Sequence, residues 1–345
     1  MRGHVRALIA VALAAGLLAL FLYNVDLRGV ASAIAGAHPL WLGLAFLSMF
    51  VNLTVRAIRW QYLLSPLGHT SFANAFRATA VGFGSRSVLP AAASEFIRPY
   101  FLSRHEPISA TGAFATVVLE RILDLLTMLM MLASFLFVFG GDLSRADPVL
   151  VAIVKGTGAF FAAGALFGLA VLFVVAGHPE RVKAVLARVE LAVPSRFAGM
   201  LGRIADKFLV GLGAVRRPGQ LLVALLWSVP LWLLIAFGIW AVAIAFDLAV
   251  PFTGSFLIIA FLTIGITVPT PGAVGGFHES FRIAVTHFFG ANDNSAVAAA
   301  IVAHVLSMAP AFLLALICAA QAGLNLTGMR QLASQADADA GRIAP

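Results

Sequence analysis

The chain has 345 residues, of which 61% are apolar and only 11% carry a formal charge. Soluble domains contain roughly 25% charged residues, so this composition excludes a water-soluble globular protein, a disordered chain and a nucleic-acid-binding module. The net charge of +8 is better explained by basic loops on the cytoplasmic side of a membrane than by a polyanionic partner. The single cysteine, Cys318, excludes an internal disulfide.

Several stretches are long enough to cross a bilayer, which takes about 20 apolar residues. In chain order, Val5–Leu22, Leu40–Val55 and Ala113–Phe139 come first, and Gly156–Gly177, Leu221–Phe246, Leu248–Phe277 and Val297–Met329 follow without any Asp, Glu, Lys or Arg. The first stretch also resembles a signal peptide, because its start is basic and an Ala-Ser-Ala sequence follows at 31–33. The apolar run ends well before that sequence, which favours a retained first helix.

The charges of the loops predict an orientation. The loop 178–218 holds eight basic and three acidic residues, whereas the opposite loops hold five Asp and two Arg. Because Lys and Arg stay on the cytoplasmic side, we expect both termini to be cytoplasmic in a bacterial plasma (inner) membrane protein. We expect one transmembrane domain over residues 1–328 and a polar cytoplasmic tail over residues 329–345.

Two apolar regions are interrupted by Pro and Gly. Region 71–104 is broken at Leu89–Ala91, and region 252–290 is broken at Pro269–Gly272 and again at Gly275 and Gly276. Proline removes a backbone donor and clashes with the preceding turn, and irregular backbone within a membrane survives only beside protein or a wet cavity. We therefore interpret each region as a re-entrant hairpin. The first enters from the cytoplasm and turns near Pro90, and the second enters from outside and turns near 271–276.

The two hairpins share a Glu-x-x-Arg motif on the returning arm, Glu95 with Arg98 and Glu279 with Arg282. Helices flank each hairpin, giving repeat units of about 40–139 and 221–321 that start on opposite sides of the membrane. This pattern predicts an all-α integral membrane protein, a helical bundle with two re-entrant broken-helix hairpins in an inverted-topology repeat. Many secondary transporters have this construction, with sites at broken helices near the midplane. Chance similarity of two short motifs is the alternative.

Nine ionisable residues fall inside these hydrophobic regions: Arg77, Arg86, Glu95, Arg98, Glu120, Arg121, Asp124, Glu279 and Arg282. One unpaired charge at the centre of an isolated helix costs about 2.5–3.5 kcal/mol on insertion scales, so these groups must pair, face water or lie near the interface. Glu95 with Arg98 and Glu279 with Arg282 are candidate ion pairs that would pin the hairpins. Arg77 is explained by snorkelling to the cytoplasmic interface.

Glu120 and Asp124 lie four residues apart, so two like charges face one side of a helix. That arrangement is unfavourable unless a cation, such as Arg86 or Arg98, sits between them. We expect a supporting network of Glu120, Arg121 and Asp124 that holds the first hairpin, with snorkelling as the alternative for Arg121.

Arginine and glycine at the predicted turns both suit an anion. Arginine makes bidentate contacts with phosphate, and Gly272, Gly275 and Gly276 allow a close backbone approach and free amides. An anionic lipid headgroup would fit both features.

Other motifs predict no metal, cofactor or nucleotide site. A zincin-like start at His278 fails, because Arg282 occupies the position of the second ligand. His278, His287 and His304 match no standard metal spacing, so we expect a polar contact inside the bundle. No Gly-x-x-x-x-Gly-Lys-Ser/Thr motif is present, and ATP-driven pumping is not expected.

Four motifs come in an order typical of one family: Arg56–Trp60, Leu89-Pro90 through Glu95–Arg98, Glu120–Asp124, and Pro271–Gly276 followed by Glu279. Across Val5–Gly323 the chain resembles the lysylphosphatidylglycerol synthase transmembrane region, or flippase-like domain, family. The resemblance implies an integral inner-membrane protein that moves a lipid between leaflets. Two-part members add a soluble C-terminal domain that aminoacylates phosphatidylglycerol. Only a short tail follows Gly328 here, so we expect no such enzyme activity. Ser94 stands where the family usually has Gly.

These features predict a flippase for a polar-headgroup lipid, anionic or isoprenoid-type, with that membrane lipid as its substrate. The predicted substrate-binding residues are Arg86, Glu95, Arg98, Gly272, Gly275, Gly276, His278, Glu279 and Arg282. Arg86, Arg98 and Arg282 would contact the phosphate, while the two glutamates would position them or exchange protons.

Three alternatives belong to other classes. The first is a membrane-embedded enzyme that modifies a lipid headgroup, with Glu95, Glu279 and His278 as acid–base groups. The second is a non-transporting partner of a lipid-synthesis complex, and the third is an ion-coupled transporter of a small solute. A homo-oligomer or a lipid-synthesis partner is compatible with the flippase hypothesis.

Overall fold

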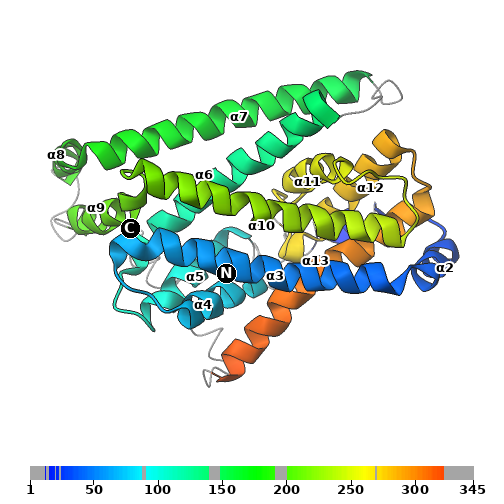
Figure 1. The fold of residues 1–345 in the computed structure, drawn as a ribbon, viewed down its shortest axis with the longest axis horizontal. Helices are drawn as coiled ribbons and strands as arrows, with labels where there is room; N and C mark the ends of the chain where they lie inside the picture. Colours follow the sequence, from blue (N-terminus) through cyan, green and yellow to red (C-terminus); the bar gives the residue numbers. More distant parts are fainter. Residues whose placement is uncertain are drawn as a thin grey trace.

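The computed structural model describes residues 12, 15–19, 21–22, 25–87, 91–139, 148–190, 200–268 and 270–321, and their regular elements are all helical (Figure 1). Four helices in this part of the chain are long and apolar enough to cross a membrane: Pro39–Leu67, Val151–Gly177, Pro218–Ala245 and Asp293–Cys318. The prediction of an all-α integral membrane protein is therefore confirmed. The predicted polar tail 329–345 and most of Val5–Leu22 lie outside the described residues.

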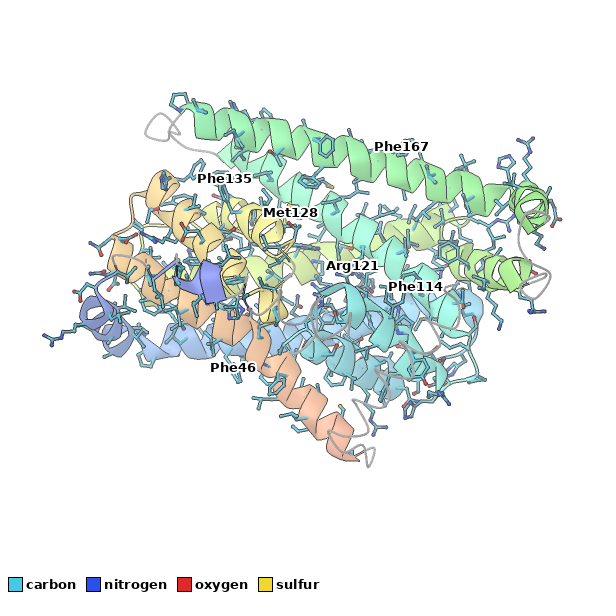
Figure 2. All side chains as sticks on the ribbon, turned by 180° about the vertical axis from the view of Figure 1, so that it is seen from behind. Phe46, Phe114, Arg121, Met128, Phe135 and Phe167 are labelled. Atoms are coloured by element: carbon cyan, nitrogen blue, oxygen red, sulfur yellow. The ribbon has the colours of Figure 1, made fainter. Side chains whose placement is uncertain are left out.

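The frame of the molecule consists of five long helices: α3 (Pro39–Leu64), α6 (Ala110–Ser134), α7 (Pro148–Gly177), α10 (Pro218–Ala245) and α13 (Asp293–Gln321). Helices α3 and α10 lie side by side in opposite directions, and α7 packs along α6 at one edge (Figure 1). Phe167 of α7 points outward in Figure 2 and is 72% exposed. Such an apolar side chain is stable only against lipid or another membrane helix.

Two pairs of short helices fill this frame. The first pair is α4 (Phe72–Ser85) with α5 (Ala91–Ser103), and the second is α11 (Gly254–Gly265) with α12 (Gly276–Phe289). A 14-residue helix rises only about 21 Å, short of the roughly 30 Å hydrocarbon core. Leu248–Phe277 is therefore not a single span, because its helix ends at Gly265.

The break in the second pair lies where the sequence predicts it. A short 3₁₀ turn covers Pro271–Ala273, and Gly272 and Gly275 have φ values of +62° and +87°. These left-handed conformations favour glycine. Pro269 and the first break at 88–90, with Pro90, lie outside the described residues. Re-entry into the bilayer and the inverted repeat stay predictions.

The two pairs open toward opposite ends of the molecule. The first pair connects α3 to α6. Near the start of α6, Gly112 lies against Leu67 and against Lys207 of helix α9 (Met200–Gly211). The second pair connects α10 to α13. The amide of His38, which caps α3, donates to the carbonyl of Ala245 at the end of α10, 2.9 Å away. We call the end of the molecule that carries the basic region 178–218 the basic end. The first pair begins and ends there, and the second pair begins and ends at the opposite end.

The basic end contains helices that sequence analysis treated as one loop. Helix α8 (Pro179–Glu190) and helix α9 (Met200–Gly211) lie within 178–218, with 191–199 outside the described residues. The Lys183 Nζ lies 3.0 Å from an Asp206 carboxylate oxygen and joins the two helices. This carboxylate raises the pKa of Lys183 by hydrogen bonding and charge. At the opposite end, α2 (Leu27–Gly36) is capped by Asp26.

The end of α4 meets the turn of the second pair inside the bundle. A Cβ at Gly272 would lie 3.7 Å from the carbonyl oxygen of Ser87, which follows α4. Helix α13 touches both pairs. Its His304 Nε2 lies 2.6 Å from the carbonyl oxygen of Gly272, and Gly84 of α4 packs against the backbone of Ala311. Pro310 lies inside α13 between these two contacts.

Candidate functional site

Eight charged side chains from α3, α4, α5 and α6 gather beside the first pair, and we call them the arginine cluster. Its members, joined by ion pairs, are Arg56, Arg59, Arg86, Arg98, Arg121, Glu95, Glu120 and Asp124. Five guanidinium groups face three carboxylates among the described residues, so the cluster carries two excess positive charges when all are ionised. An apolar surrounding makes such an excess costly without an anion.

The centre of the arginine cluster is Glu120, whose side chain is fully buried. One of its oxygens accepts hydrogen bonds from Arg98 at 2.8 Å and from Arg121 at 2.7 Å, while Arg59 lies 3.4 Å away. Because α6 places this carboxylate between α3 and α5, it ties the first pair to the frame. Such charge-assisted bonds are roughly twice as strong as neutral ones.

Asp124, one helical turn later, is held by α3 and α10. Its oxygens lie 2.7 Å from Arg59 and 3.4 Å from Arg56, and the indole of Trp232 donates to it at 3.2 Å. Arg59 also donates to the hydroxyl of Ser228, 2.7 Å away. Arg59 therefore lies beside both carboxylates, as does Arg121, which lies 3.4 Å from Asp124. These two arginines supply the positive charge that Glu120 and Asp124 require.

The partly open edge of the cluster consists of Arg86, Glu95 and Arg121. Arg86 donates a hydrogen bond to Glu95, and Arg121 lies 3.8 Å from the same carboxylate. These three side chains are 21–33% exposed, whereas those of Arg59 and Arg98 are at most 2% exposed. A ligand would therefore reach the cluster at this edge. Arg121, labelled in Figure 2, pairs with Glu95, Glu120 and Asp124, and these contacts support the predicted network more than snorkelling.

Several buried donors in the cluster make no hydrogen bond. They are Nε and Nη2 of Arg59, Nε and Nη2 of Arg98 and Nε of Arg121. The guanidinium of Arg98 stacks 3.8 Å from the ring centre of Trp60, and that of Arg86 lies 4.3 Å from Phe83. Stacking holds these groups in place without using their N–H donors. Unused donors and excess positive charge together are the chemistry of an anion site.

The predicted pairing within the first Glu-x-x-Arg motif is corrected by the structure. Glu95 pairs with Arg86 and Arg121, whereas Arg98 pairs with Glu120. Of the two cations suggested for Glu120 and Asp124, Arg98 pairs with Glu120, whereas Arg59 and Arg121 are the arginines that pair with both carboxylates. Arg77 is exposed on α4, as expected for an interfacial residue.

The second motif forms a separate cluster of Arg282, Glu279 and Asp293, which we call the α12 cluster. Arg282 donates two hydrogen bonds to Asp293, at 2.7 and 2.9 Å, and lies 3.7 Å from Glu279. It also donates to the carbonyl of Phe21. The predicted Glu279–Arg282 pair is present. Within the described residues, however, Arg282 makes no ion pair with the first hairpin, so the hypothesis of three arginines on one phosphate is not supported.

The space beside two of the three predicted glycines of the second turn is occupied by other protein atoms. A Cβ at Gly275 would lie 2.3 Å from Leu17, and one at Gly276 would lie 2.2 Å from the carbonyl oxygen of Gly265. These close contacts explain why glycine is needed there. At Gly272 a Cβ would find only ordinary van der Waals contacts, so an anion-binding role remains a prediction for this residue alone.

Two of the three singled-out histidines meet at this turn. The rings of His278 and His304 lie 4.6 Å apart, and the amide of Gly275 donates to Nδ1 of His278 at 3.2 Å. His287 instead lies beside Thr286, at 3.0 Å. No group of three metal-binding side chains is found among the described residues. The predicted polar contact in the bundle is present for His278 and His304.

Sequence analysis missed Arg56 and Arg59 as site residues. Both are buried on α3, and Arg56 also donates to Asn52, 3.0 Å away. Their spacing of three residues places them on one helical face, which is the signal that sequence reasoning had available. Arg56 and Arg59 also follow the apolar stretch Leu40–Val55, so the positive-inside rule alone is enough to explain them as the cytoplasmic end of a span.

The model of the family described as lysylphosphatidylglycerol synthase TM region matches residues 7–315 of this chain. The chain belongs to this family. The matched range contains the whole arginine cluster, the α12 cluster and the histidine pair, so these features lie in the region that defines membership of the lysylphosphatidylglycerol synthase TM region family.

Two relatives carry names. A UPF0104 membrane protein of Methanocaldococcus jannaschii is 30% identical over 111 residues, covering 31% of this chain and 33% of that protein. The glycosyltransferase AglD of Haloferax volcanii is 24% identical over 323 residues, covering 85% of this chain and 50% of that protein. The matches therefore span a third and a half of the lengths of these relatives.

Proposed function

We propose that this chain is a flippase that moves a lipid with an anionic phosphate headgroup across the membrane. The single observation that carries the proposal is the arginine cluster, in which five guanidinium groups face three carboxylates at the side of a broken helix pair. A phosphodiester would pair with these guanidinium groups while its acyl chains stay in lipid.

In this proposal the phosphate enters at the edge formed by Arg86, Glu95 and Arg121. Glu95 pairs with both guanidinium groups. A phosphodiester also carries one negative charge and offers two oxygens to arginine. Exchange of Glu95 for phosphate therefore leaves the charge of the site unchanged. The fully buried pairs around Glu120 would keep the guanidinium groups in position during the exchange.

The proposed path continues toward the second pair. Its turn at Gly272 lies against Ser87, next to Arg86 in the chain. Broken helices that meet from opposite ends are the usual setting of transporter sites. We assign the end with α8 and α9 to the cytoplasm, because its loops are basic, and we place the protein in the bacterial plasma membrane with both termini cytoplasmic.

The proposal is tested with the purified full chain in phosphatidylcholine vesicles that contain NBD-labelled phosphatidylglycerol. Lipid movement is measured as fluorescence protected from, and then lost to, dithionite. We expect Arg86→Gln and Arg121→Gln each to slow movement by about tenfold, the equivalent of roughly 1.4 kcal/mol for one lost charge-assisted contact. The matched control is Arg77→Gln, which removes the same charge from an exposed position on α4.

A Glu95→Gln variant gives the proposal a second, opposite signature. Without the carboxylate, Arg86 and Arg121 have no competing partner at the edge of the cluster. We expect labelled phosphatidylglycerol to bind more tightly and to cross more slowly, because release becomes rate-limiting. Equal rates in the unaltered protein and all four variants, or equal slowing in the Arg77→Gln control, would contradict a role for this edge.

One observation favours a second candidate, a membrane-embedded enzyme that modifies lipid headgroups. The name of AglD describes a glycosyltransferase, and the match covers half of that protein. A change in the mass of the reconstituted lipid after incubation with sugar nucleotides would support this candidate, and unchanged lipid mass together with movement would favour the flippase. Copurification of a lipid-synthesis enzyme, with both arginine variants fully active, would support a role as its non-transporting partner.

A further inference from the structure

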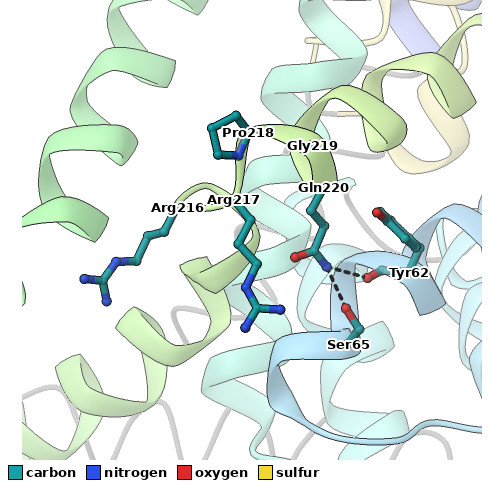
Figure 3. A pocket seen from close by; sticks show the side chains of 7 residues that line it. All are labelled: Tyr62, Ser65, Arg216, Arg217, Pro218, Gly219 and Gln220. Atoms are coloured by element: carbon teal, nitrogen blue, oxygen red, sulfur yellow. Dashed lines mark hydrogen bonds between the residues drawn. The ribbon is translucent and has the colours of Figure 1, made fainter.

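A polar hollow lies at the basic end of the molecule, where α3 ends and α10 begins (Figure 3). It has a volume of about 560 Å³ and is open to the surface. The residues that line it come from the end of α3 and the start of α10: Tyr62, Ser65, Arg216, Arg217, Pro218, Gly219 and Gln220. None belongs to the arginine cluster.

The charge of this hollow is positive. Arg216 and Arg217 are both exposed, and neither forms an ion pair with any carboxylate in the described part of the chain. Arg217 is also the N-cap of α10 and contributes no side-chain cap hydrogen bond. The positive end of a 28-residue helix therefore adds to two unpaired guanidinium groups.

A buried acceptor in the same hollow lacks a donor. Gln220 is only 8% exposed, and its Nε2 donates to the carbonyl of Tyr62 at 3.1 Å and to Ser65 at 2.6 Å. This carbonyl is only an acceptor, so it fixes which way the amide faces. The Oε1 of Gln220 is left buried with no hydrogen bond, and in Figure 3 it points toward the side of Arg217. Buried acceptors without a donor are rare.

The ligand that would satisfy both features carries an anion and a hydrogen-bond donor a few ångströms apart. We propose that this hollow binds the headgroup of a membrane glycerophospholipid whose phosphate meets Arg216 and Arg217 and whose hydroxyl or ammonium group donates to Gln220. The hollow lies at the ends of two candidate spans, where lipid headgroups are concentrated. This site is independent of the proposed translocation path and does not require transport.

The experiment is a native mass spectrometry titration of the full chain in detergent with phosphatidylglycerol, phosphatidylethanolamine and phosphatidylcholine. The first two headgroups contain a donor, while the quaternary ammonium of phosphatidylcholine does not. We expect Arg216→Gln/Arg217→Gln to weaken the binding of one phosphatidylglycerol by about fivefold. We also expect the unaltered protein to bind phosphatidylcholine several-fold more weakly than the other two.

The control is Arg181→Gln/Arg203→Gln, which removes two exposed charges from α8 and α9 at the same end of the molecule. Equal weakening in both double variants would mean that only net charge matters and would overturn the site. Soluble glycerol 3-phosphate that competes as well as the lipid would overturn the choice of a membrane lipid. Lipid movement in vesicles that is unchanged in Arg216→Gln/Arg217→Gln, beside weakened binding, would separate this site from the arginine cluster.

Discussion

The α4–α5 pair and the α11–α12 pair each return with a glutamate and an arginine three residues apart, and the two pairs differ in what surrounds these residues. Arg98 is buried against Trp60 and Glu120, in a cluster shared by four helices. Arg282 is partly exposed and pairs with Glu279 and with Asp293 at the start of α13. The same short motif therefore produces a shared charge network in one pair and a local ion pair in the other.

The difference comes from the neighbouring helices. Helix α6 presents Glu120, Arg121 and Asp124 to the first pair, and each of these three charges has several partners. The second pair packs in an apolar cluster that includes Phe256, Phe277 and Phe281. A motif on one helix therefore says little about function until the facing helix is known. The predictions that follow separate the two pairs by experiment.

The largest difference in stability between the two pairs is expected when one carboxylate is removed from each cluster. Asp124→Asn leaves Arg56 without a carboxylate partner and Arg59 with only Glu120, 3.4 Å away, and breaking a buried pair in this way costs about 3–5 kcal/mol. Glu279→Gln removes a partner at the longer distance of 3.7 Å from a partly exposed Arg282, and it should cost less than about 1 kcal/mol. Thermal unfolding of both variants in the same detergent measures this contrast. Similar melting temperatures would show that the first cluster is not a stabilising unit.

Glycines at the helix contacts should show the next largest effect. A Cβ at Gly276 would lie 2.2 Å from the carbonyl oxygen of Gly265, so Gly276→Ala must push the backbones of α11 and α12 apart. A Cβ at Gly82 would lie 2.8 Å from the Cβ of Arg98, between α4 and α5. We expect Gly276→Ala to destabilise by about 1–3 kcal/mol, as overpacking does, and Gly82→Ala by less. The order is read from unfolding in parallel, and the reverse order would contradict the contact geometry.

Acid should loosen the first pair selectively. The carboxylate of Glu106, in the turn after α5, accepts hydrogen bonds from Asn74 and from Ser71 at the start of α4. These bonds lower the pKa of Glu106. Because the folded pKa is below the unfolded value of about 4.3, the stabilisation is present above that value and is lost as the pH falls through the folded pKa.

Hydrogen exchange measures this effect near the start of each pair. Amides of 72–75 in α4 should exchange faster in acid after correction for intrinsic rates. Amides of 254–257 in α11 should not, because Thr253, the N-cap of α11, makes no side-chain cap hydrogen bond. Glu106→Gln should remove the pH dependence of the first segment. A pH dependence that persists in this variant would assign it to another group.

The smallest effect is expected for the exposed ion pair between α8 and α9. Lys183→Gln removes the contact with Asp206, and such surface pairs contribute little because water and salt screen them. We expect no resolvable change in the melting temperature at physiological salt. Asp293→Ala, which removes both acceptors of the Arg282 hydrogen bonds, should be measurably worse. Equal effects would show that the α12 cluster also behaves as an exposed pair.

Composition and the interruptions by Pro and Gly were enough to predict the helical membrane fold and the short helices at 71–104 and 252–290. The like charges of Glu120 and Asp124 were enough to predict a buried network. Which arginines complete it was not predictable, because hydropathy does not report the rotation of a helix. Arg59 ends an apolar stretch, where an interfacial position and an inward-facing position have the same sequence pattern. Likewise, spacing placed Glu95 and Arg98 on one face, but the rotation of α5 gives them different partners.

Pro310 interrupts the backbone hydrogen bonding of α13 between its contacts with the two helix pairs. Proline has no amide hydrogen, so the helix lacks one rung of its hydrogen-bond ladder between the part that holds the Gly272 carbonyl and the part that packs on Gly84. Bending at this point breaks no existing backbone bond. The part of α13 that contacts the second turn is therefore joined to the part that packs on α4 through the point where the helix resists bending least.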